Sequence, residues 1–185
     1  MVSVAGLVLA AGGGSRFGGP KALATTDSGV PWVTQAVGTL HAAGCSRVVV
    51  VLGAGAEQAA GLVPAAAHRV VADRWAEGMG ASLAAGLGAL LPGEAVLITL
   101  VDLPGLPVTA CLRVLGDEVR ATTLRRAVYD GRPGHPVLLG DAHIAPFAAS
   151  LHGDRGGREY LRAAGADPIE CGDLFSGADV DRRQP

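Results

Sequence analysis

The stretch VAGLVLAAGGGSRFGGPK, residues 4–21, decides how this chain folds. Its first half is an apolar run rich in β-branched residues, and it breaks at Gly12 into a glycine-rich loop that carries Arg16 and Lys21. Such a loop suits a polyphosphate, because glycine lets backbone amides approach phosphate oxygens and the two cations supply charge. A turn that merely connects a strand to a helix is the alternative. The two cations favour phosphate binding over it.

Two well-known phosphate loops do not match this stretch. A P-loop requires Gly-Lys-Ser/Thr, whereas Lys21 lies between Pro20 and Ala22. The G-x-G-x-x-G fingerprint fails as well, since Phe17 occupies the sixth place counted from Gly12. If the loop binds phosphate, it therefore does so as a different kind of loop.

Length and composition predict a single domain over residues 1–185. The chain is 49% hydrophobic, which is enough for a sizeable core. A net charge of -2 indicates no basic face for nucleic acid, so an anionic ligand has to be a small one held by local cations. The three cysteines are scattered singly, which predicts a reducing, cytoplasmic setting. We read the apolar N-terminus as a core strand and expect no membrane segment.

The hydrophobic pattern predicts alternating strands and helices. We expect strands over residues 4–9, 48–52, 69–71, 95–101 and 122–129, helices over 31–43, 57–62, 107–119 and 153–164 and within 72–91, and a loop over 130–136. This alternation predicts a three-layer α/β/α sandwich with a mostly parallel sheet. Residues 177–185 look loosely ordered. Ligands of such sheets lie at the carboxyl ends of strands, so the glycine loop and Asp102 are expected to share one cleft.

Asp102 follows the buried run 95–101 directly. A carboxylate that faces a polyphosphate loop suits magnesium, which prefers one or two carboxylates plus substrate phosphates. A turn or capping role before Pro104 is the alternative.

The loop LAAGGGSRFGGPKAL, residues 9–23, resembles the L-A-(A/G)-G-x-x-x-R-M-G-x-x-K loop of the MobA-like nucleotidyltransferases, most closely that of the molybdenum cofactor cytidylyltransferases. Phe17 replaces the usual Met, an apolar exchange that we do not expect to matter. The resemblance implies a Rossmann-like sheet of the nucleotide-diphospho-sugar transferase type. It also implies nucleotide binding by Leu9, Ala10, Ala11, Gly12, Gly13, Gly14, Arg16 and Lys21.

Two further segments extend the resemblance on the nucleotide side. VADRWAEGMGASL, residues 71–83, implies that Asp73, Gly78 and Ser82 lie near the nucleotide, although Asp73 or Ser82 could simply cap a helix. ADVDRRQP resembles the start of the family's V-D-T-P-E-D-L segment and makes Asp181 a second metal ligand beside Asp102. The rest of that pattern is missing, so a solvated aspartate in the tail is an equal alternative.

The acceptor side of the resemblance lies in GRPGHPVLLG, residues 131–140, and GDRGGREYL, residues 153–161. They imply that His135, Arg155 and Arg158 bind an anionic acceptor. Taken singly, the histidine could be a turn residue bonded to backbone and the arginines a solvated helix start.

The implied reaction is transfer of CMP from CTP to a phosphorylated acceptor, molybdopterin, with Mg²⁺ and release of pyrophosphate. Arg16, Lys21 and Asp102 are the implied catalytic residues. Ala11 favours CTP, because the GTP branch of the family has L-A-G-G in place of L-A-A-G. A guanylyltransferase, or a transferase for another phosphorylated acceptor, is the enzymatic alternative. The unusual tail around Asp181 keeps open an inactive, nucleotide-binding chaperone or regulator of a client molybdoenzyme.

Overall fold

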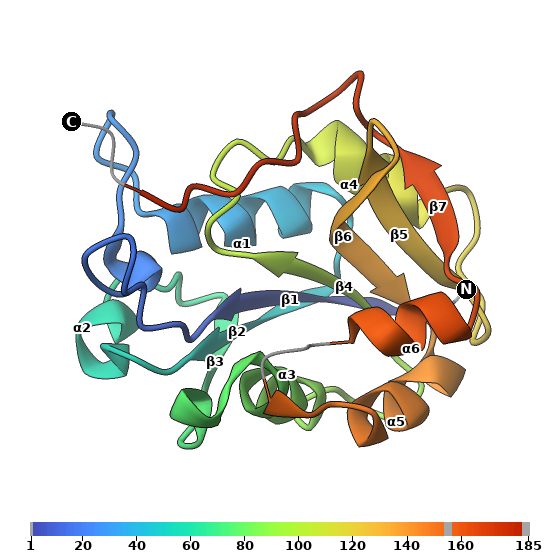
Figure 1. Cartoon of the computed structure of the whole chain (residues 1–185), viewed down its shortest axis with the longest axis horizontal. Coiled ribbons are helices and arrows are strands. Elements are labelled where there is room, and N and C mark those ends of the chain that lie inside the picture. Colours follow the sequence, from blue (N-terminus) through green and yellow to red (C-terminus); the bar gives the residue numbers. More distant parts are fainter. Residues whose placement is uncertain (1, 154–156, 183–185) are drawn as a thin grey trace.

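The computed structural model describes residues 2–153 and 157–182. Its strands form one sheet in the order β3-β2-β1-β4-β6-β5-β7, with helices on both faces (Figure 1). All strand pairs are parallel except those that β6 makes with β4 and β5. The predicted three-layer sandwich with a mostly parallel sheet is confirmed.

The strands are β1 (Val4–Ala10), β2 (Arg47–Leu52), β3 (Ala67–Val71), β4 (Ala95–Leu100), β5 (Leu124–Tyr129), β6 (Arg132–Leu139) and β7 (Asp167–Glu170). The α-helices are α1 (Trp32–Ala42), α2 (Ala56–Ala60), α3 (Met79–Leu87), α4 (Val108–Leu115), α5 (Asp141–Ala149) and α6 (Arg158–Ala163). Short 3-10 helices cover Lys21–Leu23 and Trp75–Glu77. Among the described residues, no helix is long and apolar enough to cross a membrane.

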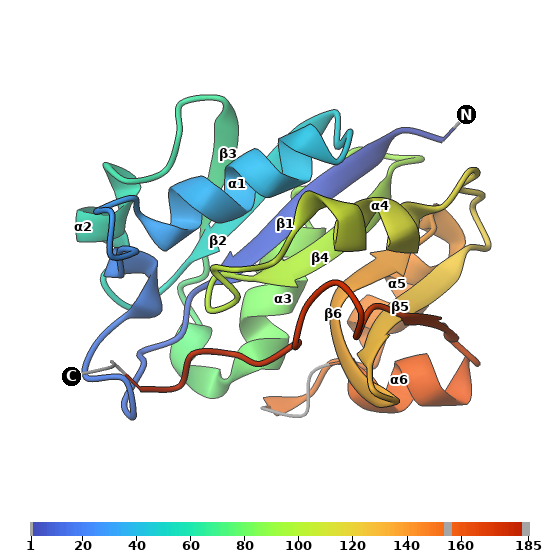
Figure 2. The same ribbon diagram turned by 90° about the horizontal axis from the view of Figure 1, so that it is seen from above.

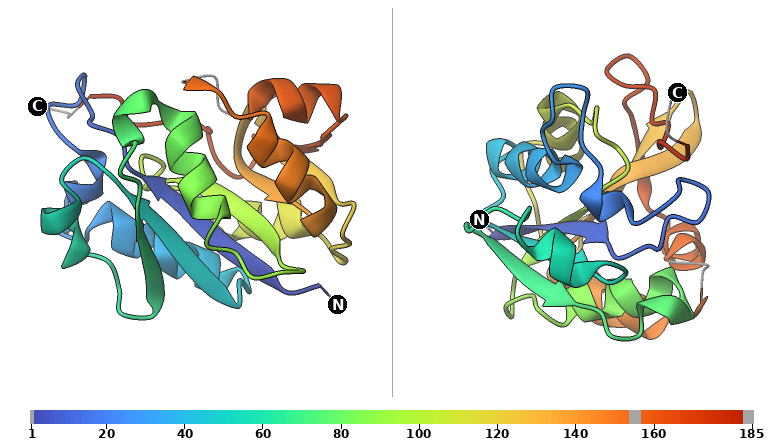
Figure 3. Two further views of the ribbon diagram at one scale, coloured as in Figure 1. Left: turned by 90° about the horizontal axis from the view of Figure 1, so that it is seen from below. Right: turned by 90° about the vertical axis from the view of Figure 1, so that its left-hand side faces the viewer.

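The core is divided by the sheet into two apolar layers. Helices α1 and α4 cover one face (Figure 2), and α3, α5 and α6 cover the other (Figure 3). Successive residues of β1 serve both layers, because side chains alternate along a strand: Val8 packs on the α1 side, while Leu7 and Leu9 pack on the α3 side. This explains why the central strands are continuous apolar runs rather than alternating ones.

The expectation of a loop over residues 130–136 is wrong. Strand β6 begins at Arg132 and forms a hairpin with β5 across the turn at Asp130 and Gly131, both of which have positive φ. Pro133 and Pro136 argue against a strand, because proline cannot donate to a sheet ladder. They are accommodated because β4 pairs only with residues 137–139 of β6, which leaves one edge of the proline-containing part open.

Besides β6, helix α5 and strand β7 were not expected from the sequence. Helix α5 contains Pro146, and β7 contains Pro168 and is mostly exposed, so neither carries a strong pattern. Strand β7 pairs with β5 alone at the edge of the sheet. Edge positions tolerate proline, since one side of the strand needs no ladder bonds.

The C-terminal segment, residues 171–182, returns from β7 across the sheet to the loop after β1 (Figure 1, dark red). We expected residues 177–185 to be loosely ordered. The described part of them has no helix or strand, but the Val180 amide donates to the Asp102 carbonyl at 3.0 Å. The segment therefore brings the end of the described chain to its beginning.

Candidate active site

The shape of the loop after β1 is set by Gly14. Its carbonyl oxygen accepts hydrogen bonds from the amides of Phe17, Gly18 and Gly19 at 2.9, 2.9 and 3.1 Å. Its φ of +60° is one that residues with a side chain rarely adopt. The Phe17 ring is buried against Trp32, with ring centroids 5.3 Å apart, and so fixes the loop to α1. Position 17 therefore favours an apolar residue.

Two carboxylates and two cations meet at the carboxyl ends of β1 and β4. The Lys21 amine donates to Asp102 Oδ2 at 2.8 Å and to Asp181 Oδ1 at 3.3 Å, and Arg16 Nη1 donates to Asp181 Oδ2 at 2.8 Å. Asp102 and Lys21 therefore lie together at one edge of the sheet, as we expected for the glycine loop and Asp102. Asp181 lies in this cluster although the sequence after it differs from the V-D-T-P-E-D-L pattern.

The cluster is partly shielded from water. The side chains of Lys21 and Asp102 are 14% and 17% exposed, while that of Asp181 is 40% exposed. Burial alone would lower the pKa of Lys21, but the hydrogen bonds and charges of Asp102 and Asp181 raise it overall. The hydrogen bond from Lys21 lowers the pKa of Asp181. Lys21 and Asp181 are thus both charged at neutral pH.

A cavity of about 190 Å³ lies beside this cluster. Seven of the predicted nucleotide-binding residues line it, together with the predicted metal ligand Asp102: they are Leu9, Ala10, Ala11, Gly12, Gly14, Lys21 and Ser82. The remaining wall comes from Met79, Leu100 and Val101. Residues from β1, α3 and the end of β4 therefore enclose one space.

Four other predicted nucleotide-binding residues do not line this cavity. Gly13 faces the ring of Trp75, and the Arg16 side chain is 75% exposed beside Asp181. Asp73 is exposed, and Gly78 precedes α3 with a φ of +119°. Neither Asp73 nor Ser82 makes a side-chain capping bond to α3 among the described contacts.

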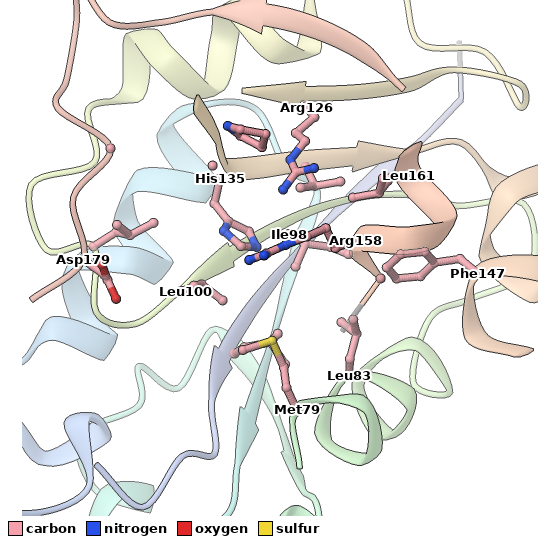
Figure 4. Close-up of a pocket in the computed structure, with 17 residues that line it drawn as sticks. Met79, Leu83, Ile98, Leu100, Arg126, His135, Phe147, Arg158, Leu161 and Asp179 are labelled. Atoms are coloured by element: carbon pink, nitrogen blue, oxygen red, sulfur yellow. The ribbon is translucent and has the colours of Figure 1, made fainter. Parts of the chain in front are cut away.

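A second cavity of about 270 Å³ adjoins the first and shares Leu9, Met79 and Leu100 with it. Two of the predicted acceptor residues, His135 on β6 and Arg158 at the start of α6, line it (Figure 4). Arg155, the third, lies outside the described residues. The structure thus brings His135 and Arg158 together although the sequence separates them.

Arg126 on β5 also lines the second cavity, although no motif in the sequence marks it. The available signal was an arginine pair inside an otherwise apolar strand. Arg125 donates to the carbonyls of Val114, Leu115 and Glu118 on the α4 side, whereas Arg126 points to the opposite face. Which of the two faces a cavity depends on the register of the strand.

His135 is partly buried in the wall of the second cavity and lies near two cations. Burial, followed by the charges of Arg126 and Arg158, lowers the pKa of His135 to about 4. The imidazole is therefore neutral at neutral pH, where it can donate one hydrogen bond and accept another. The positive charge of this wall comes from the arginines.

The depressed pKa of His135 predicts a stability change with pH. Between pH 6.5 and 4 the unfolded chain takes up a proton at this residue that the folded chain does not, so the free energy of unfolding falls as the pH falls. His135→Gln should make this decline shallower by on the order of 3 kcal/mol over that range. Urea unfolding at several pH values measures it. His68→Gln, an exposed histidine on β3, is the control, and an unchanged slope in His135→Gln would contradict the assignment.

The domain profile of the MobA-like NTP transferases matches residues 6–169 of the chain. A nicotine blue oxidoreductase of Paenarthrobacter nicotinovorans is 39% identical over 190 residues, which cover 96% of this chain and 92% of that protein.

Solved structures have the same fold. Rv0371c from Mycobacterium tuberculosis superposes with a TM-score of 0.80 at 24% identity, over 98% of this chain and 94% of that one. A nucleotidyl transferase from Methanothermobacter gives 0.79 at 20% identity, over 97% and 92%. A structure of Rv0371c in complex with manganese gives 0.70 at 24% identity, over 91% and 87%.

Proposed function

Because the chain belongs to the MobA-like NTP transferase family, we propose that it transfers CMP from CTP to a phosphorylated acceptor, molybdopterin, and releases pyrophosphate. The observation that carries this proposal is the contact of Lys21 with both Asp102 and Asp181 beside the glycine loop. It joins a candidate phosphate-binding cation to two candidate metal ligands, and Lys21 and Asp102 line one cavity. Ala11, which lines that cavity, supports CTP over GTP through the resemblance of L-A-A-G to the CTP branch.

The carboxylates fit a divalent ion such as Mg²⁺. Asp102 Oδ1 is buried and has no hydrogen-bond partner among the described residues. This carboxylate oxygen is therefore available to coordinate a hard cation. No group of three or more His, Cys, Asp or Glu side chains suited to a metal occurs in the described part of the chain. Magnesium needs only one or two carboxylates when substrate phosphates complete its shell. Asp102 and Asp181 would hold it, and the manganese complex of Rv0371c is consistent with such an ion.

The chemistry follows from charge and position. An oxygen of the acceptor phosphate attacks the α-phosphorus of CTP, a new P–O bond forms, and the bond to the β-phosphate breaks in line. No catalytic base is needed, because the second pKa of a phosphate monoester is about 6. Lys21 and Arg16 offset the charge that grows on the leaving pyrophosphate. The metal, when bound, neutralises triphosphate oxygens.

Nucleotide binding has to exchange partners within the cluster. In the free protein Lys21 and Arg16 are both paired with carboxylates. When the triphosphate takes these cations, the carboxylates are released for the metal. Metal and nucleotide should therefore bind with positive coupling.

A nucleotide panel tests the proposed reaction. The purified protein is incubated with Mg²⁺, molybdopterin and each of CTP, GTP, ATP and UTP, and pyrophosphate release is measured. We expect release with CTP, with kcat/KM for GTP lower by roughly tenfold or more. Release that depends on GTP instead would make the protein a guanylyltransferase. Tight CTP binding without release would favour a binding protein.

Oxidoreduction is a second candidate, favoured by the 39% identity to nicotine blue oxidoreductase. In that case the nucleotide would be a reduced nicotinamide cofactor, and the neighbouring cavity with its apolar walls would hold the electron acceptor. Nicotine blue reduction by NADH or NADPH, followed by absorbance, tests it. Reduction that persists in Asp102→Ala would favour this activity over nucleotidyl transfer.

A further inference from the structure

Arg126 lies in the wall of the second cavity, and no described carboxylate pairs with its charge. Its Nε atom is buried and lacks a hydrogen-bond partner among the described residues. It shares the cavity with Arg158, and no carboxylate in the described ranges forms an ion pair with either arginine. Figure 4 shows both guanidinium groups and the ring of His135 pointing into the same space. Arg126 is partly buried and Arg158 is exposed, so the unpaired charge of Arg126 is the one that gains most when a ligand supplies a negative group.

The one carboxylate on the described wall of this cavity lies apart from the arginines. Asp179, on the C-terminal segment, is at the far end of the cavity from Arg126 and Arg158 in Figure 4. Burial, and after it the charge of Arg158, lower the pKa of Arg126. This direction is the one expected for a cation that is partly removed from water and has no anion beside it.

The remaining walls are apolar. Leu83, Ile98, Val137, Phe147 and Leu161 form them. Arg126, Val137 and Ile98 lie in register across β5, β6 and β4, so their side chains share one face of the sheet and form the floor of the cavity. A flat, largely apolar body with an anionic group at one end matches this arrangement of floor and charge.

The positive charge of Arg126 lies away from the proposed reaction centre at Asp102. Asp102 follows Ile98 by four residues along the chain, and Arg126 is two strands across the sheet from Ile98, about 10 Å. Arg126 lines only the second cavity, whereas Lys21 and Asp102 line only the first. An anion at Arg126 is therefore a different group from the phosphate that reacts beside Asp102.

We propose that Arg126, together with Arg158, binds a second anionic oxygen group of the acceptor, carried on a flat apolar ring body that lies over Ile98 and Val137. This inference rests on the proposed function only in that the ligand is taken to be the acceptor. The substrate is thus a two-ended molecule, with its reacting phosphate at the glycine loop and its second anion on β5. Arg126 selects the acceptor and does not take part in phosphoryl chemistry.

Binding of 2-naphthoate, a flat apolar ring with one carboxylate, tests the site directly. Isothermal titration calorimetry should show saturable binding that weakens by roughly tenfold or more in Arg126→Gln. Uncharged 2-naphthamide should bind the wild-type protein correspondingly less well. Arg162→Gln, which changes an exposed arginine one turn beyond Arg158 on α6, is the matched control and should bind 2-naphthoate like the wild type.

Two outcomes would overturn the proposal. One is the absence of 2-naphthoate binding, or equal affinity in Arg126→Gln and the wild type. The other is affinity that is lost in Lys21→Gln but kept in Arg126→Gln, which would put the probe in the glycine loop.

Thermal unfolding separates ligand binding from a structural role. Arg126→Met removes a partly buried charge that has no ion-pair partner among the described residues and keeps the apolar stem, so the free protein should melt at the same or a higher temperature. A lowered melting temperature would show that Arg126 supports the fold. CTP affinity should be unchanged in both Arg126 variants. If the wild type releases no pyrophosphate yet binds 2-naphthoate through Arg126, the proposed transferase reaction fails while the anion site stands.

Discussion

Asp102→Ala is expected to lower kcat for pyrophosphate release by roughly 10³-fold, because it removes the buried ligand oxygen of the proposed metal site. Asp102 Oδ1 has no hydrogen-bond partner in the described structure, so the fold gains little from it. Lys21 keeps its contact with Asp181. The free energy of unfolding should therefore change by only about 1 kcal/mol. Steady-state kinetics with CTP and denaturant unfolding measure the two effects.

Asp173→Ala is the matched control for this change. It also removes an aspartate from an ion pair, with Arg113 at the protein surface, but lies outside both cavities. Its activity should equal that of the wild type. If Asp102→Ala retained more than about a tenth of the wild-type kcat, a metal role for this carboxylate would be excluded.

Gly14→Ala is expected to collapse the loop after β1. A Cβ atom at this position would clash with the Gly19 carbonyl, and the φ of +60° is strained for alanine. The three amide bonds to the Gly14 carbonyl would be lost or distorted. We expect kcat/KM for CTP to fall by roughly 10²-fold or more and the free energy of unfolding by about 3 kcal/mol.

Gly29→Ala separates the two causes of this effect. Gly29 also has a positive φ, +82°, but nothing lies within 4 Å of an added Cβ and the residue lines neither cavity. It should lose about 1 kcal/mol of stability and keep its activity. An equal loss of kcat/KM in both variants would show that backbone strain alone, and not the shape of the loop, is responsible.

The strands and helices that could be predicted from the sequence are those with a clear local pattern, such as an apolar run or a proline at a helix start. The buried runs of β1, β2 and β4 are apolar on both faces, and Pro31 precedes α1. Strand β6 escaped prediction because its prolines argue against a strand unless the extent of pairing with β4 is known. The pairing partner of a strand is a property of the assembled sheet, which local sequence does not encode.

The candidate site divides in the same way. The sequence by itself determined the glycine loop, its two cations and Asp102 at a strand end, because each follows from residues adjacent to one buried strand. Only the tertiary structure brought Asp181 to Lys21, across 160 residues, and turned Arg126 rather than Arg125 toward the second cavity. The physical reason is that side chains distant in sequence meet only when the sheet order, the strand register and the path of the C-terminal segment are fixed together.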